Sequence, residues 1–172
     1  MPSFRTTRRV RHSRENMFDL VADVEHYPLF LPLCQALTVR RRDLDEAGNG
    51  VVVADMQVGY KAIRETFTSR VTLDRPALLI HVEYVEGPFR SLQNQWTFEP
   101  DPQRPDGTGC VVGFFITYEF RSRMLSMLMG SMFDQAFRRF SEAFERRADQ
   151  VYGRPGRQPQ PPRPAFQGGE PS

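Results

Sequence analysis

The residues that could do chemistry are few and lie far apart in the sequence. The histidines His12, His26 and His81 lack the spacing of a metal site, and neither a nucleophile elbow nor a phosphate-binding glycine motif occurs. Cys34 lies in an apolar stretch, where burial raises the pKa of a thiol, so we expect a structural cysteine. Glu65 could transfer a proton from a strand face, but a carboxylate paired with a neighbouring arginine is the commoner role. The sequence therefore predicts neither a catalytic residue nor a metal ligand.

Composition and charge exclude several classes of protein. The chain has 172 residues, of which 40% are hydrophobic and 26% charged, as is usual for one soluble domain. The formal net charge of +2 equals that of residues 153–172, so residues 1–152 are neutral overall and we expect no DNA partner. No apolar run is long enough to span a membrane, and two cysteines cannot form a disulfide scaffold. These features favour a reducing compartment.

The elements that would position these residues follow an α+β pattern. Residues 4–12 alternate between two faces, which indicates a strand, although an arginine-rich organelle leader is the alternative. A short helix capped by Ser13 follows, and two prolines limit residues 23–34 to a second, irregular helical turn. Residues 36–120 contain short strands joined by turns, which predicts an antiparallel sheet. We expect one domain over residues 1–152 and a disordered Pro/Gly-rich tail over residues 153–172.

Residues 123–152 predict a helix of about eight turns. Its apolar residues recur at three- and four-residue steps, which is typical of a helix laid on a sheet. The space between a curved sheet and such a helix can hold an apolar ligand or be filled by side chains, and periodicity does not separate the two. Asn94 and Glu65 are polar exceptions on inward faces, where a ligand oxygen could partner them.

The start of this helix is apolar nearly all round and rich in methionine. Its outer side must meet another subunit, a membrane or the segment 27–33, and Arg121 and Arg123 suit an anionic lipid surface. The side chains that we expect to touch a membrane are Met124, Leu125, Met127, Leu128 and Met129.

Several segments in this order resemble one protein family. They are DVEHYPLFLPLC at 23–34, FTSRV at 67–71, EGPFRSLQNQW at 86–96, YEF at 118–120, FERRA at 144–148 and VYG at 151–153. Together they resemble the coenzyme Q-binding family of the START-like (helix-grip, polyketide cyclase/dehydrase) superfamily, whose bacterial relatives include the ribosome association toxin. The resemblance covers nearly all of residues 1–153. One departure is Leu33, because family members tied to coenzyme Q often carry Trp directly before this Cys.

The resemblance implies a helix-grip fold, in which a seven-stranded curved antiparallel sheet wraps around a long C-terminal helix and two short helices follow the first strand. It also implies a lipophilic cavity, with the segment from Tyr27 to Cys34 at its wall or entrance and Trp96 and the final helix as floor and lid. We expect the ligand to contact Tyr27, Pro28, Phe30, Leu33, Met56, Phe67, Tyr84, Asn94, Trp96, Phe115, Tyr118, Met132, Phe133 and Phe137.

The function that follows is sequestration of ubiquinone or a related polyprenyl lipid in support of respiratory electron transport, without chemistry and with transient membrane contact. The place of action would be the bacterial cytoplasm, at the inner membrane, or the mitochondrial matrix in a eukaryote. A toxin that binds the large ribosomal subunit and blocks subunit joining is the first alternative. An enzyme of the polyketide cyclase/dehydrase type is the second, with Glu65 as its acid–base candidate.

Overall fold

The structure is a computed structural model that describes residues 2–153. The expected tail therefore lies outside the described residues except for Gly153. The elements, in chain order, are β1 (Ser3–Val10), α1 (Arg14–Ala22), the 3-10 helix η1 (Val24–Leu29), β2 (Cys34–Leu44), β3 (Gly50–Tyr60), β4 (Ile63–Asp74), β5 (Leu79–Glu86), β6 (Phe89–Pro100), β7 (Cys110–Phe120) and α2 (Arg123–Tyr152).

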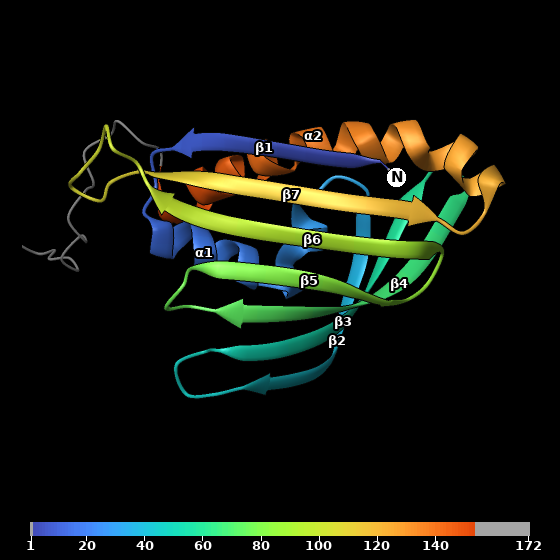
Figure 1. Cartoon of the computed structure of the whole chain (residues 1–172), viewed down its shortest axis with the longest axis horizontal. Helices are drawn as coiled ribbons and strands as arrows, with labels where there is room; N and C mark the ends of the chain where they lie inside the picture. The colour runs from blue at the N-terminus through green and yellow to red at the C-terminus, as the bar shows by residue number, and fades with distance from the viewer. Residues whose placement is uncertain (1, 154–172) are drawn as a thin grey trace, which may run out of the picture.

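The seven strands form one antiparallel sheet in the order β1-β7-β6-β5-β4-β3-β2. Each neighbouring pair other than β1–β7 is consecutive in sequence, so short turns join most of the sheet. The sheet curves, and α2 runs along its concave side while α1 and η1 cover one end (Figure 1). The expectation of an α+β helix-grip fold is confirmed, as is the strand at the N-terminus.

The core lies between the sheet and α2, and strand alternation decides which side chains enter it. In β7 the even-numbered residues from Cys110 to Phe120 are buried and the odd-numbered ones are half-buried. The expectation that Phe115 points inward is therefore wrong. Phe115 lies on the outer face, where the Arg5 guanidinium sits 4.4 Å from its ring centroid. Because β7 is apolar on both faces, its sequence does not reveal which set faces the core.

The two short helices close one end of the core. The Ser13 hydroxyl caps α1 by accepting a hydrogen bond from Asn16 N at 3.1 Å. Pro28 lies inside η1, and the tighter 3-10 geometry accommodates it in place of a regular helix. The Tyr27 hydroxyl donates to the carbonyl of Val21, which ties η1 to the last turn of α1.

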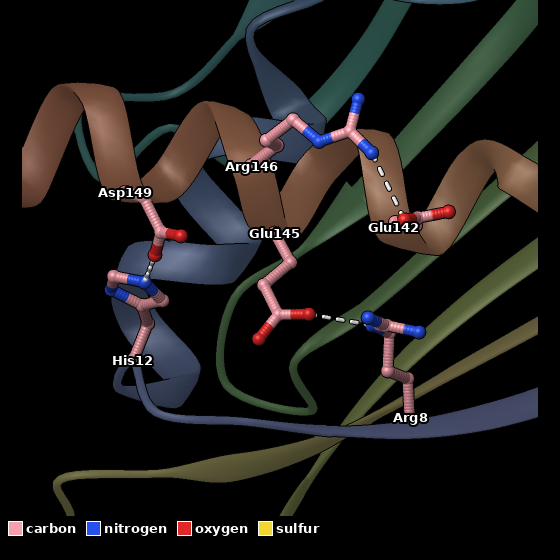
Figure 2. A network of polar contacts seen from close by, with 6 residues as sticks. All are labelled: Arg8, His12, Glu142, Glu145, Arg146 and Asp149. Atoms are coloured by element: carbon pink, nitrogen blue, oxygen red, sulfur yellow. Dashed lines mark hydrogen bonds and ion pairs between the residues drawn. The ribbon is translucent and has the colours of Figure 1, made fainter. Parts of the chain in front are cut away.

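Polar contacts attach the C-terminal half of α2 to β1 and to the residues after it. Arg8 Nε lies 2.6 Å from Glu145 Oε1, and His12 Nε2 lies 2.7 Å from Asp149 Oδ1 (Figure 2). The His12 side chain is only 5% exposed, so its contact with Asp149 is shielded from water. Neither described helix of the domain, nor η1, is long and apolar enough to cross a bilayer.

Candidate ligand cavity

An apolar cavity of about 100 Å³ lies between α2 and the concave face of the sheet. Its wall includes residues of η1, of the segment leading into β2, of strands β2–β7, and the inner face of α2. None of its lining side chains carries a formal charge. The predicted ligand contacts that the structure brings together in this wall are Tyr27, Leu33, Met56, Phe67, Asn94, Trp96, Phe133 and Phe137.

Other predicted contacts lie close to the cavity without lining it. The Phe30 ring packs at 5.1 Å from the Phe144 ring centroid, behind the wall. The Tyr84 hydroxyl accepts a hydrogen bond from Phe89 N at 3.1 Å and is occupied in joining β5 to β6. Tyr118 is buried and packs at 5.2 Å from the Phe137 ring centroid. These three aromatic side chains support the wall from outside.

Pro28 and Met132 are half-buried and also lie outside the lining. Pro32, four residues after Pro28, lines the cavity in its place, because the chain leaves η1 between the two prolines. Met132 lies on α2 directly before Phe133, whose side chain does enter the cavity. Neighbouring helix positions point about 100° apart, and this rotation turns Met132 away from the cavity while Phe133 enters it.

The cavity wall also contains residues that the sequence reasoning did not select as ligand contacts. Ser69 follows Phe67 by two residues on the inner face of β4, so alternation alone could have found it. Phe144 lies seven residues after Phe137 on α2, which is again the same face. Phe114 was missed because its neighbour Phe115 was assigned to the inside. Ala136 lies on the apolar face that the periodicity of this helix predicts, but it was not selected, since a small residue contributes to a cavity through the space it leaves.

Three polar groups interrupt the apolar wall. The Asn94 Nδ2 donates to the carbonyl oxygen of Phe115 at 2.9 Å, which leaves the amide oxygen as the acceptor of this side chain. Ser69, only 8% exposed, places its hydroxyl in the cavity wall. Burial raises the pKa of the Tyr27 hydroxyl, which stays protonated and donates to Val21. The wall can therefore solvate one or two polar atoms of an otherwise apolar ligand.

Glu65 does not join these groups. It is half-buried on β4, outside the cavity lining. The nearby arginines have other partners, since Arg64 Nη1 donates to Gln35 Oε1 at 2.9 Å and Arg90 Nε lies 4.0 Å from Glu119 Oε2. Within the described residues no three His, Cys, Asp or Glu side chains are grouped as a metal site.

Cys34 lies just outside the cavity and is buried. Burial raises the pKa of its thiol to about 11, against a smaller opposing effect of its contact with the Ala36 carbonyl. A thiol with this pKa is protonated at neutral pH and is a poor nucleophile. The preceding residue, Leu33, has a φ of 69°, a left-handed conformation that costs a residue with a side chain about 1 kcal/mol.

The methionine-rich start of α2 divides between two environments. Met124, Met127 and Leu128 are 69%, 83% and 54% exposed. Leu125 is half-buried against the core, and Met129 is only 1% exposed. The expectation that Met129 faces outward is therefore wrong. Leu125 is only partly available for an outside contact, because it packs against the core. A helix that is apolar on every side does not reveal from sequence which stripe the core will cover.

Taken together, the antiparallel sheet, the gripping helix and the enclosed apolar cavity define a START-like protein. A START superfamily protein from Mycobacterium smegmatis has the same fold, with a TM-score of 0.68 at 18% identity over 87% of this chain and 98% of that one. The model of the family described as polyketide cyclase/dehydrase and lipid transport matches residues 10–145. The chain belongs to this family.

Curated relatives fall into two groups within the family. The ribosome association toxin RatA of Vibrio cholerae is 37% identical over 144 residues, which is 84% of this chain and 93% of the toxin. The mitochondrial coenzyme Q-binding protein COQ10 homolog B of Xenopus laevis is 32% identical over 144 residues, which is 83% of this chain and 56% of that protein. The chain thus spans nearly the whole toxin but only about half of the coenzyme Q-binding relative.

Proposed function

We propose that this protein binds a polyprenyl quinone or a similar lipid between its sheet and α2, and acts as a carrier rather than a catalyst. The observation that carries the proposal is the cavity, which is enclosed by uncharged side chains and contains a few polar atoms. An isoprenoid chain gains about 0.8 kcal/mol for each CH₂ group that leaves water for such a wall. The Ser69 hydroxyl and the second N–H of the Asn94 amide can donate hydrogen bonds to the oxygens of a ring.

The relatives support this choice of ligand. COQ10 homolog B is named as a coenzyme Q-binding protein, and the family description includes lipid transport. A carrier of this kind would act in the bacterial cytoplasm beside the inner membrane, or in the matrix of a mitochondrion. A cyclase or dehydratase would need an acid–base pair beside its substrate, and the cavity lining offers no carboxylate, imidazole or amine.

The size of the cavity sets a condition on binding. Pockets for small molecules commonly enclose roughly 300–1,000 Å³. The present cavity of about 100 Å³ accommodates only part of a prenylated ring, so α2 or the η1 segment must move outward when the ligand enters.

Filling the cavity tests the proposal. Ala136 lines the cavity and is 6% exposed, so Ala136→Leu should occupy the space that the ligand needs. We expect this substitution to raise the apparent Kd of a short-chain quinone, measured by quenching of Trp96 fluorescence, by about tenfold or more. A ligand that can no longer bury two of its methylene groups loses about this much affinity. Trp96 is the single tryptophan of the chain, so the signal reports from the cavity.

Gln135→Leu is the matched control, because it introduces the same side chain on the same turn of α2 but on the exposed side. Its apparent Kd should stay within about twofold of that of the unmodified protein, because a change of this size is no larger than the effect of one weak contact. Equal quenching in all three proteins would remove the cavity as the binding site. Organic extraction and mass spectrometry of protein from its own host would then identify any lipid carried elsewhere.

A second candidate function is ribosome association. It is favoured by the extent of the match, since 93% of the Vibrio cholerae toxin is covered and its identity of 37% exceeds the 32% of the coenzyme Q-binding relative. Growth arrest on overexpression, together with co-sedimentation with the large ribosomal subunit, would support this function. Protein that carries quinone and leaves growth and subunit joining unchanged would refute it.

A further inference from the structure

The first two turns of α2 carry an exposed apolar surface that the fold does not use. Met124, Met127 and Leu128 are spaced by three and four residues and so lie on one side of the helix. We call these three side chains the apolar lip. They are three of the seven large hydrophobic side chains that are exposed in the described part of the chain.

The lip is separate from the surface that holds α2 in place. Leu125 and Met129 on the opposite side supply the packing against the core, so the helix does not need the outer side chains for its stability. Figure 1 shows that the start of α2 lies at one end of the molecule, beside the end of β7 and away from α1. The start of α2 therefore lies where a partner can approach the molecule from its end.

Along the chain, the charges nearest to the lip all have one sign. From Phe120 to Phe133 the charged residues are Arg121 and Arg123, and both are exposed. Arg121 Nε donates to the carbonyl of Phe89 at 3.2 Å, which holds this side chain at the end of the sheet. Cations are unfavourable near the N-terminus of a helix, and the first turn of α2 contains no acidic residue. The two arginines therefore do not stabilise the helix, but they would attract an anionic surface.

We propose that the apolar lip docks on a lipid bilayer with anionic headgroups, with Arg121 and Arg123 at the headgroup level. A helix that presents apolar side chains next to basic ones has the composition of an interfacial membrane contact. A second copy of the chain is a poorer occupant, because three side chains cannot supply the roughly 800 Å² per partner of a stable interface.

Docking would place the cavity-lining part of α2 close to a source of lipid ligand. Phe133 and Phe137, less than three turns after the lip, line the cavity from the same helix. This part of the inference rests on the proposed function, whereas docking itself does not. Outward movement of the α2 start at the bilayer would expose the cavity to lipid rather than to water.

Vesicle flotation of the full chain tests the docking. The vesicles contain phosphatidylcholine, alone or with phosphatidylglycerol at about 30 mol%. Met127→Asp replaces the most exposed side chain of the lip, and we expect its partition coefficient to fall by about tenfold or more. Arg123→Gln should lower binding to the anionic vesicles by about fivefold and leave the weak binding to neutral vesicles unchanged.

Val151→Asp is the matched control. Val151 is 49% exposed on the same helix, about 36 Å from Met127, so the same change is made outside the lip. Its partition should stay within about twofold of the unmodified protein, since a distant charge is screened by salt. Equal losses in the Met127 and Val151 variants, or no vesicle binding by the unmodified protein, would overturn the proposal. A dimer that Met127→Asp dissociates in light scattering would assign the lip to a second copy instead.

A measurement without vesicles separates this proposal from the function above. Quenching of Trp96 by a short-chain quinone should be the same in Met127→Asp and in the unmodified protein, because Met127 lies outside the cavity. Absence of quenching in both proteins would count against the quinone carrier and leave the docking result standing. Loss of quenching in Met127→Asp alone would show a disturbed cavity and overturn a role confined to docking.

Discussion

At the scale of single residues, the informative side chains are the polar ones in an apolar wall. A hydroxyl in an apolar wall can hydrogen-bond a ligand atom that water would otherwise solvate, so such a contact contributes to binding. Ser69 is the hydroxyl of this kind that comes from the sheet. Ser91 on β6 and Ser141 on α2 carry buried hydroxyls with no hydrogen-bond partner among the described residues, but neither lines the cavity.

The pair of serines allows a controlled prediction. Ser69→Ala should weaken the binding of a short-chain quinone by about two- to tenfold, the usual net value of one hydrogen bond, while the free protein loses no stability. Ser141→Ala should leave the apparent Kd unchanged and stabilise α2 by a few tenths of a kcal/mol, since alanine is the better helix former. Quenching of Trp96 measures the apparent Kd of each variant, and urea denaturation measures its stability. A loss of binding in the Ser141 variant alone would place the ligand on the other side of α2.

At the scale of elements, α2 consists of three parts with different tasks. Its start carries the apolar lip, its middle lines the cavity, and its end is attached to β1 and His12 by polar contacts. Because the end is attached in this way, we expect any opening movement of α2 to involve its start. Gly130 lies between the lip and the cavity, and an added Cβ there would meet no atom closer than Ser126 Oγ at 4.0 Å. Packing therefore does not require a glycine at this position.

Gly130→Ala should raise the free energy of unfolding by about 0.5–1 kcal/mol, because it removes backbone freedom from the unfolded chain and from the helix. The same change should slow the uptake of quinone in stopped-flow quenching of Trp96, if the start of α2 opens the cavity. Ser131→Ala, at the exposed neighbouring position, is the control for helix propensity alone. A stabilised Gly130 variant with an unchanged uptake rate would assign the opening to η1.

At the scale of the whole molecule, the closed core determines how stability depends on pH. Burial raises the pKa of Cys34 to about 11 and that of Cys110 to about 12, from an ordinary value of 9.0. The unfolded chain therefore loses these protons first as pH rises. The stabilisation is complete below about pH 9 and is lost progressively as pH rises through 11 and 12. Burial of the Tyr27 hydroxyl acts in the same direction.

Under reducing conditions we accordingly expect the urea midpoint to fall steadily from pH 8 to pH 11. Cys110→Ala should be less stable at pH 8, because Cys110 is fully buried, but its midpoint should fall less over the same interval. Parallel curves for the two proteins would show that the Cys110 thiol does not contribute to the alkaline loss.

The sequence by itself determined the order of the elements, the antiparallel sheet and the helix that grips it. Turn residues and apolar periods of two and 3.6 residues are local properties, so they can be recognised without knowledge of the tertiary contacts. It also identified Asn94 and Trp96 as inward residues, because they share a strand face with Leu92 and Phe98, and Phe137, because it lies on the apolar face of the final helix.

The tertiary structure alone decided which side faces the core wherever a segment is apolar all round. Phe115 lies outside and Met129 inside for this reason, since the packing of neighbouring strands and not the local pattern sets the phase. The contribution of Ala136 and the volume of the cavity were equally invisible in the sequence. A cavity is the difference between the space that the backbone encloses and the side chains that enter it, and only the assembled fold determines both.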